Sequence, residues 1–286
     1  MRILFAGGDA RMKYAAEKLS GAHDITRFGE EYNGTFDAVV LPLPLTKDGE
    51  TIFSPQGDKS PLTTFEALFE EVGEAADEHT LVLAGGEAPA LTELCGKRGF
   101  GLVNYFARET LTLRNAALTA EAALCILSQS GDGALLGSEA LIAGGGRIAV
   151  FLAERLRACG CAVTLAARDP NKRELLRLNG YNAVPLEELH EILPRFDCIA
   201  NTIPAPIFDE RLFSQMRADA VYTELATLSE EPRRTFAQRR GVKYIFAGGL
   251  PGKCSPKAAG GFIADELEAV IASREAGRRL GSCKSQ

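Results

Sequence analysis

The sequence predicts an α/β protein made of two doubly wound, parallel-sheet domains joined by a long helix. Short apolar runs alternate with amphipathic stretches along the chain, a pattern typical of βα units. The chain has 286 residues, a length that suits two domains of roughly 150 residues each. Residues 108–130 are rich in Ala and Leu and contain neither Gly nor Pro, which predicts one helix between the two series of strands.

The first domain is expected to span residues 1–110 and to hold a small, flavodoxin-like sheet. Its predicted strands are Arg2–Ala6, Asp24–Phe28, Ala38–Leu41, Leu81–Ala84 and Gly101–Val103. Its predicted helices are Arg11–Leu19, Pro61–Ala75 and Ala88–Lys97. Pro42 and Pro44 end the third strand, because proline cannot donate a hydrogen bond to a ladder. A last helix, residues 261–275, is expected to pack back on this domain.

Residues 111–136 are expected to form the bridging helix and a linker, broken at Ser130–Gly133. The second domain is expected to span residues 137–260. Its predicted strands are Ala140–Ala143, Ala162–Ala166, Cys198–Asn201, Val221–Leu225 and Tyr244–Phe246.

The composition excludes several classes of function. A net charge of -6, from 32 basic and 38 acidic side chains, argues against nucleic acid, whose phosphates require a basic patch. The sequence holds no apolar run near the roughly 18 residues of a membrane span and no signal peptide, so we expect a cytoplasmic protein. The seven cysteines are an odd number, and no histidine lies near Cys159-Gly160-Cys161. We therefore expect reduced, buried thiols and no metal site.

The strongest local motif is the stretch 144–149 (GGGRIA), which follows the apolar strand 141–143 and opens a helix. It has the form G-x-G-x-x-A that binds dinucleotides in Rossmann domains. Gly144 would make the tight turn, Gly146 would let the backbone approach a pyrophosphate, and Ala149 would let helix and strand pack closely. The helix N-terminus would present free N–H groups to the phosphates. The second domain is therefore predicted to be an NAD(P)-binding Rossmann fold.

The end of the next strand indicates NADP rather than NAD. An NAD site usually has Asp or Glu there to bind the ribose 2′-hydroxyl, whereas Arg168 stands 22 residues after Gly146. Arg168 and the following Lys172 could pair with a 2′-phosphate. Asp169 could cap the next helix instead of binding ribose. NAD, and a merely solvated basic helix start, remain the alternatives.

Further cofactor contacts are expected at the carboxyl ends of the later strands, where open sheets bind their ligands. One of these segments, residues 248–253, is expected to be a flexible loop. The full set of expected cofactor-binding residues is Gly144, Gly146, Arg147, Ile148, Ala149, Arg168, Lys172, Asn201, Thr202, Ile203, Pro204, Ala226 and Pro251.

Several other segments stand out beside the glycine loop, in a fixed order over nearly the whole chain. They are 6–11 (AGGDAR), 41–49 (LPLPLTKDG), Asn115 with Thr119-Ala120-Glu121, 201–204 (NTIP), 249–252 (GLPG) and 255–260 (SPKAAG). Together with 144–149 they resemble the A-subunit family of dipicolinate synthase.

The resemblance implies an oxidoreductase subunit in the mother cell of a sporulating bacterium. It would oxidise a (4-hydroxy)tetrahydrodipicolinate- or dihydrodipicolinate-type dicarboxylate to pyridine-2,6-dicarboxylate, together with a flavoprotein-like B-subunit of dipicolinate synthase. NADP would be a natural hydride acceptor for this loss of water and two electrons. A homo-oligomer is compatible with the sequence. The alternative is a non-catalytic NADP-binding partner or sensor protein whose chemistry lies on the other chain.

The chain departs from the family pattern at several positions. Residues 224–232 read ELATLSEEP where the family usually has Asp-Leu-Ala-Ser and a Pro-Gly-Gly turn. Leu118 replaces a proline, Ala122 replaces a glycine, and the linker before residue 137 lacks the family's histidine. These changes indicate a divergent member.

A dicarboxylate substrate requires cationic groups in its site. Lys257 is the first candidate, as a carboxylate partner or a proton carrier, against a plain surface lysine. Arg11 could bind the other carboxylate, unless Asp9 caps the helix and Arg11 faces solvent. The segments of the resemblance place Gly8, Asp9, Arg11, Asn115, Thr119 and Ser255 as substrate-binding residues, and Lys257 and Glu121 as catalytic ones.

Glu121 is the candidate general base, although Asn115 lies six positions away and therefore on another helix face. His23, His79 and His190 are expected at the surface. A 2-hydroxy-acid dehydrogenase would need a histidine late in the second domain, so the sequence argues against that class.

Overall fold

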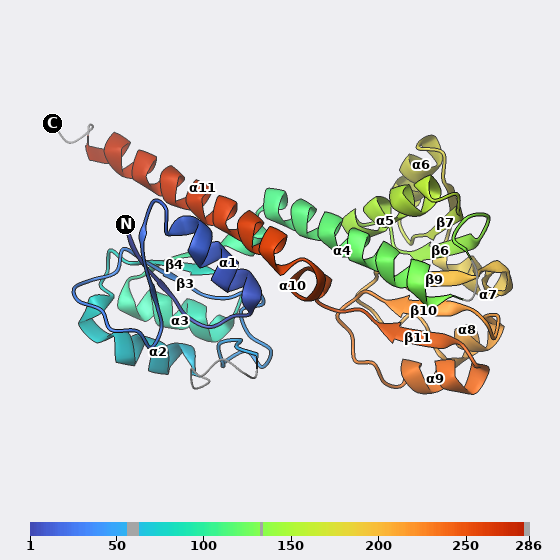
Figure 1. Ribbon diagram of the computed structural model, residues 1–286, viewed down its shortest axis with the longest axis horizontal. Coiled ribbons are helices and arrows are strands. Elements are labelled where there is room, and N and C mark those ends of the chain that lie inside the picture. The colour runs from blue at the N-terminus through green and yellow to red at the C-terminus, as the bar shows by residue number, and fades with distance from the viewer. Residues whose placement is uncertain (56–62, 132–133, 283–286) are drawn as a thin grey trace. The chain divides into compact units, whose positions relative to one another are not determined.

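The chain folds into two compact units, residues 1–114 with 255–286, and residues 115–254. The structure is a computed structural model that describes residues 1–55, 63–131 and 134–282. Each unit is a parallel sheet covered by helices on both faces (Figure 1), so the predicted fold class is confirmed. Residues 132 and 133, within the predicted linker, and Pro61, at the predicted start of a helix, lie outside the described residues.

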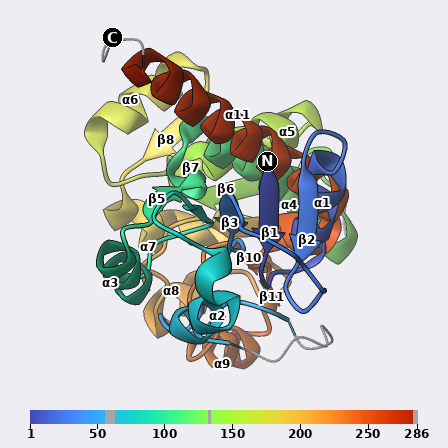
Figure 2. The same cartoon turned by 90° about the vertical axis from the view of Figure 1, so that its left-hand side faces the viewer.

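In its described residues the first unit contains five parallel strands in the order β2-β1-β3-β4-β5. The strands are β1 (Arg2–Phe5), β2 (Asp24–Arg27), β3 (Ala38–Val40), β4 (Leu81–Ala84) and β5 (Gly101–Asn104). The helices are α1 (Ala10–Leu19), α2 (Phe65–Val72), α3 (Pro89–Arg98) and α11 (Pro256–Ser282). Ile3 and Phe5 of β1 pack towards α1 and α11, whereas Leu4 between them packs towards α2 and α3. Figure 2 shows β1 between β2 and β3.

The described part of the second unit contains six parallel strands in the order β11-β10-β9-β6-β7-β8. The strands are β6 (Glu139–Ala143), β7 (Ala162–Ala166), β8 (Asn182–Val184), β9 (Cys198–Asn201), β10 (Val221–Glu224) and β11 (Lys243–Phe246). The helices are α5 (Arg147–Ala158), α6 (Pro170–Leu178), α7 (Leu189–Ile192), α8 (Glu210–Gln215), α9 (Arg233–Arg240) and α10 (Leu250–Cys254). Counted from β6, this is the order 3-2-1-4-5-6 of a Rossmann domain, with its switch point between β6 and β9.

Both faces of the second sheet are apolar, as parallel sheets require. Ala140 and Ile142 of β6 pack towards α4 (Glu109–Ser130) and α5, whereas Leu141 and Ala143 pack towards α7, α8 and α9. Helix α4 contributes residues to both units, because the division between them falls after Arg114.

Three local expectations differ from the structure. The short strand β8 was not expected, because its three residues carry no strand pattern of their own and depend on pairing with β7. The loop expected at Gly248–Lys253 contains α10. The last helix starts at Pro256 rather than at 261, and residues 255–260 accordingly belong to the first unit instead of the expected second domain, 137–260.

Gly260 lies within α11, at the point where this helix packs against α1. A Cβ atom at this position would lie 2.4 Å from the carbonyl oxygen of Arg11 and 2.7 Å from the Cβ of Tyr14. Gly260 therefore lets α11 approach α1 closely, whereas a Cβ atom on Gly261 would meet nothing within 4 Å.

None of the helices in the described residues is long and apolar enough to cross a membrane. Within the same residues, no group of three or more His, Cys, Asp or Glu side chains could hold a metal ion. The six described cysteines, Cys95, Cys125, Cys159, Cys161, Cys198 and Cys254, are all free thiols.

Candidate functional site

The glycine turn after β6 is built so tightly that its first residue must be glycine. Gly144 has φ 125°, and a Cβ atom there would lie 2.1 Å from Thr202 Oγ1. Thr202 is itself held because its hydroxyl donates to the carbonyl oxygen of Ala143 at 2.9 Å. The turn after β6 and the loop after β9 are therefore in direct contact at the switch point of the sheet.

The N-terminus of α5 is open to a ligand. Gly146 is the N-cap residue, and no side chain of the described residues caps the helix there. A Cβ atom on Gly146 would meet nothing within 4 Å, so the backbone is accessible from outside. Ala149, one turn into the helix, is fully buried against the sheet. The first N–H groups of α5 thus have the geometry of an anion-binding helix N-terminus.

The loop after β7 and the first turn of α6 each present one cation near the glycine turn. Arg168 and Lys172 are exposed, and the Lys172 stem lies 3.7 Å from the place of a Cβ on Gly145. Arg173, in contrast, donates to the carbonyl oxygens of Ala167 and Arg168 at 2.8 and 2.7 Å and serves the fold.

Asp169 is the N-cap of α6. Its carboxylate accepts a hydrogen bond from the backbone N–H of Asn171 at 2.9 Å. The acidic residue at the end of β7 is therefore used to cap a helix, which leaves Arg168 and Lys172 as the groups that face the solvent there.

A buried polar network joins the ends of β9 and β10. Asn201 is 1% exposed and donates from Nδ2 to Glu224 Oε1 at 2.9 Å, while its Oδ1 accepts from the N–H of Ile203 at 3.0 Å. Glu224, the last residue of β10, is 0% exposed and also accepts from the Tyr222 hydroxyl at 3.0 Å. Arg233 Nε lies 3.2 Å from Glu224 Oε2.

Burial dominates the electrostatics of this network. It raises the pKa of the Glu224 carboxyl, against the opposing hydrogen bonds and the charge of Arg233. It raises the pKa of the Tyr222 hydroxyl well above its ordinary value, and the Glu224 carboxylate adds to that shift. Tyr222 therefore stays protonated and remains a hydrogen-bond donor to Glu224.

The structure places the expected cofactor-binding residues of the second unit at one edge of its sheet. Residues 144–149, Arg168 with Lys172, residues 201–204 and Ala226 follow the carboxyl ends of β6, β7, β9 and β10. Pro251 is buried in α10, which follows β11.

Arg11 is buried rather than facing solvent, in contrast to the alternative considered for it. It is 7% exposed, and its Nε and Nη2 donate to the Asp9 carboxylate at 2.9 and 2.8 Å. Nη2 also donates to the carbonyl oxygen of Leu43. Asp9 caps α1 through the backbone N–H of Arg11 at 3.0 Å, as the capping alternative expects. Gly8 precedes this pair with φ 99°.

The remaining expected residues lie on two different units. Lys257 is exposed in the first turn of α11, close to Ser255, in the first unit. Asn115, Thr119 and Glu121 lie on the part of α4 in the second unit. Thr119 donates back to the carbonyl oxygen of Asn115 at 2.8 Å, and Glu121 is exposed.

Arg233 and Tyr222 are not among the residues expected from the sequence, and Glu224 is expected there only as part of an altered turn. A signal for them exists. Glu224 follows the apolar run that starts at Val221 and precedes Leu225-Ala226, so it must be buried, and a buried carboxylate requires a cation close by. The pair Arg233-Arg234 is near in sequence.

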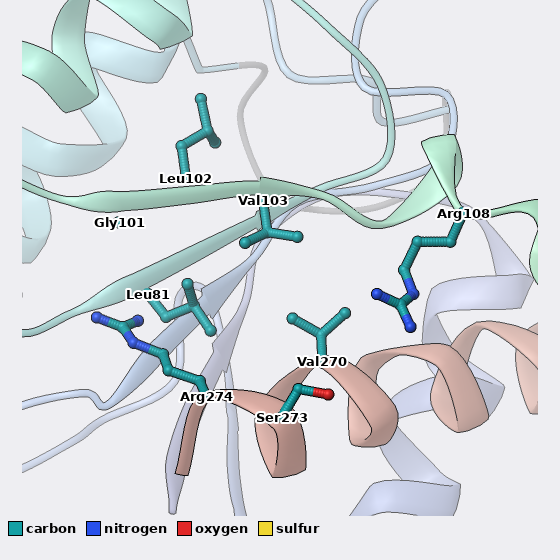
Figure 3. Close-up of a pocket in the computed structure, with 8 residues that line it drawn as sticks. All are labelled: Leu81, Gly101, Leu102, Val103, Arg108, Val270, Ser273 and Arg274. Carbon is teal, nitrogen blue, oxygen red and sulfur yellow. The ribbon is translucent and has the colours of Figure 1, made fainter. Parts of the chain in front are cut away.

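A cavity of about 430 Å³ lies elsewhere, on the first unit between β4, β5 and α11. Figure 3 shows Leu81, Val103 and Val270 pointing towards one another, with Arg108 and Arg274 at its two ends. None of the expected site residues is among the described residues that line it.

Comparison with known proteins places the chain next to one family. No protein-family model matches it. The A-subunit of dipicolinate synthase from Bacillus subtilis (strain 168) is 26% identical over 296 residues, which cover 96% of this chain and 97% of the relative. The chain is a divergent relative of that protein. The resemblance found in the sequence motifs is thus confirmed.

Solved structures agree with this relationship. The crystal structure of the dipicolinate synthase A-subunit from Bacillus halodurans has a TM-score of 0.82 at 24% identity, and covers 95% of this chain and 98% of its own. Its Bacillus subtilis counterpart has a TM-score of 0.82 at 23% identity over 97% of both chains. The fold is also shared with L-alanine dehydrogenase, at a TM-score of 0.61, 13% identity and coverage of 95% and 89%. A dehydrogenase therefore shares this fold.

Proposed function

We propose that the chain is an NADP-dependent oxidoreductase subunit that converts a dihydrodipicolinate-type dicarboxylate to pyridine-2,6-dicarboxylate. The observation that supports it is the open N-terminus of α5 behind the Gly144 turn, at the switch point of a Rossmann-ordered sheet. Its Bacillus subtilis relative bears the name of dipicolinate synthase. A flavoprotein-like second protein and the mother-cell cytoplasm of a sporulating bacterium belong to the same proposal.

The residues present fit a nicotinamide dinucleotide. Gly144 and Gly146 leave room for the phosphates, which the N–H groups of α5 would bind. Arg168 and Lys172 would bind a 2′-phosphate. When bound, the cofactor supplies a hydride acceptor. Asn201, Thr202 and Ala226 would line the other half of the site and exclude water from it.

Lys257 and Glu121 are proposed as the groups that serve the substrate. An exposed lysine can pair with a carboxylate, and an exposed glutamate can exchange protons with solvent. Arg11 is not proposed as a direct carboxylate partner, because its Nε and Nη2 already donate to Asp9 and Leu43.

The cofactor preference is tested by replacing Arg168 with Asp and titrating NADPH and NADH by fluorescence. We expect the Kd for NADPH to rise about tenfold or more, because a charge-assisted pair is lost and a repulsive one is added. The Kd for NADH should change by less than about threefold. Equal effects on both cofactors would contradict the role of Arg168.

Arg195→Asp is a matched charge reversal at the opposite edge of the same sheet, where Arg195 pairs with Glu139 at the start of β6. It should leave both Kd values unchanged. If the unaltered chain binds neither cofactor at millimolar concentration, the oxidoreductase proposal is wrong.

A second candidate function is an NADP-binding partner or sensor protein without chemistry of its own. The acidic turn that ends in Glu230-Glu231-Pro232, where the family usually has Pro-Gly-Gly, favours it. Co-expression with the flavoprotein-like second protein, with product analysis in the presence and absence of NADP, separates the two. Lys257→Met should reduce product formation if the chain is catalytic, and unchanged turnover would contradict the role of Lys257.

A further inference from the structure

The carboxylate of Glu224 accepts three hydrogen bonds and forms one ion pair. Oε1 accepts from Asn201 Nδ2 at 2.9 Å and from the backbone N–H of Ala226 at 3.2 Å. Oε2 accepts from the Tyr222 hydroxyl at 3.0 Å and lies 3.2 Å from Arg233 Nε, an ion pair whose N–H is not aligned for a hydrogen bond. Each of these neighbours is a donor or a cation, so the arrangement fits an ionised carboxylate.

Two of these contacts fix the loops that leave β9 and β10. Because Asn201 Nδ2 is held by Glu224, its Oδ1 must face the N–H of Ile203, which shapes the turn from Asn201 to Ile203. The same Glu224 oxygen holds Ala226, two residues beyond the end of β10. One carboxylate oxygen therefore joins two loops that are far apart in the sequence.

Arg233 anchors the far end of the second loop. It is 4% exposed at the start of α9, and its Nη2 donates to the carbonyl oxygen of Ser229. Glu224 and Arg233 thus hold both ends of residues 225–232, the segment that departs from the family pattern. This segment contains no glycine, and the ion pair fixes the points at which it leaves β10 and enters α9.

The network also reaches the glycine turn. Thr202 follows Asn201, and its Oγ1 occupies the space that a Cβ on Gly144 would need. A shift of the Asn201–Ile203 turn would therefore change the wall of the dinucleotide site at the switch point, on the side of β9 and β10.

We propose that Glu224 is a positioning residue that fixes the two loops around the nicotinamide half of the cofactor. This inference rests on the proposed function, because it requires a dinucleotide across the switch point. The adenylate half would lie on the other side, over β7, where Arg168 and Lys172 are. Loss of the Glu224 network should therefore weaken binding of the whole cofactor and spare its adenylate half.

The test compares NADPH with 2′,5′-ADP, a fragment that lacks the nicotinamide half. Glu224→Gln replaces an acceptor oxygen with an NH₂ donor that faces other donors. We expect the Kd for NADPH to rise about tenfold and the Kd for 2′,5′-ADP to stay within about twofold. An unchanged Kd for NADPH, or equal losses for both ligands, would overturn the inference.

Glu266→Gln is the control for a purely structural effect. Glu266 is a 5% exposed carboxylate of α11 that pairs with Arg108 in the first unit. Its replacement should lower the Tm and leave both Kd values unchanged. If Glu224→Gln behaves in the same way, Glu224 serves stability alone and the inference is wrong.

Asn201→Ala keeps the carboxylate and its ion pair with Arg233, and it carries the test if Glu224→Gln does not fold. It should also raise the Kd for NADPH and leave the Kd for 2′,5′-ADP nearly unchanged. The double variant, with both Asn201 and Glu224 replaced, should bind NADPH no more weakly than either single variant. Additive losses would overturn the inference. Failure of the unaltered chain to bind either ligand would instead disprove the proposed function.

Discussion

In each unit one strand runs into a glycine turn and a helix, but among the described residues a side chain caps that helix only in the first unit. In the first unit β1 runs into Gly7-Gly8 and α1, and in the second β6 runs into the 144–146 glycines and α5. Asp9 caps α1 and binds Arg11, which fills the turn and reaches Leu43. No described side chain caps α5, and the space over Gly146 is empty.

This difference explains why only one of the two glycine turns has the geometry of an anion-binding helix N-terminus. A helix N-terminus attracts an anion because its first N–H groups lack partners. Asp9 supplies the first turn with an internal anion, and Arg11 neutralises that anion. In α5 the same groups are left for a ligand. The two glycine turns therefore look alike in sequence, and the residue at the N-cap decides whether the first N–H groups of the helix stay open.

We expect the largest effect, on the free energy of unfolding, when the carboxylate of Asp9 is removed from the first unit. Asp9→Ala removes the cap of α1 and leaves the buried Arg11 without its carboxylate, so we expect a loss of about 3–5 kcal/mol in the free energy of unfolding. Urea unfolding followed by circular dichroism measures it. Asp169→Ala removes an exposed cap in the second unit and should cost only about 1 kcal/mol. Similar losses in both variants would show that Arg11 does not depend on Asp9.

We expect a smaller effect, mainly on cofactor affinity, when the turn before α5 receives an aspartate at its N-cap, as the turn before α1 has. Gly146→Asp places a carboxylate at the N-cap of α5, in space that is empty. We expect the Kd for NADPH to rise about tenfold or more, since the carboxylate repels the diphosphate and competes for the same N–H groups. The free energy of unfolding without cofactor should rise by only about 0.3 kcal/mol, because glycine is itself a fair N-cap residue.

Gly146→Ala is the control for size. It adds a methyl group without charge, so the difference between the two variants reports the electrostatic part and should shrink at high salt. Equal Kd values of the Gly146→Asp and Gly146→Ala variants for NADPH would contradict the role given to the open N-cap.

The smallest effect concerns one buried thiol in each unit. Burial raises the pKa of Cys95 to about 11 and that of Cys198 to about 12, so both are protonated at pH 8 and poor nucleophiles. A thiol reagent at pH 8 should label the exposed Cys125 and Cys254 first. Because labelling of a buried thiol requires opening of its own unit, NADP should slow labelling of Cys198 and leave Cys95 unchanged. Equal protection of both would place the cofactor contact elsewhere.

Much of the fold follows from local patterns. The apolar runs predicted ten of the eleven strands in the described residues to within about a residue at each end, because a parallel strand must be apolar on both faces. The missed strand, β8, has only three residues and forms through its partner β7. The start of α11 was expected at residue 261 and lies at Pro256. The sequence cannot distinguish a glycine that permits close helix packing, such as Gly260, from one that ends a helix.

The site divides in the same way. The spacing of Gly144, Gly146 and Ala149 predicted the turn between β6 and α5, because such a turn depends on the local backbone of adjacent residues. Spacing could not locate Arg233, or the burial of Arg11, because these depend on which carbonyl or carboxylate lies next to each guanidinium in space.

The sequence by itself therefore determined the βα alternation, the glycine turn and the succession of elements, all of which rest on contacts between residues near in the chain. Only the tertiary structure decided that Asp9 closes one turn while Gly146 leaves the other open. It also joined Asn201, Glu224 and Arg233 into one network. The physical reason is that a buried charge is stable only beside its partner, and that partner is chosen by the packing of the whole sheet rather than by distance along the chain.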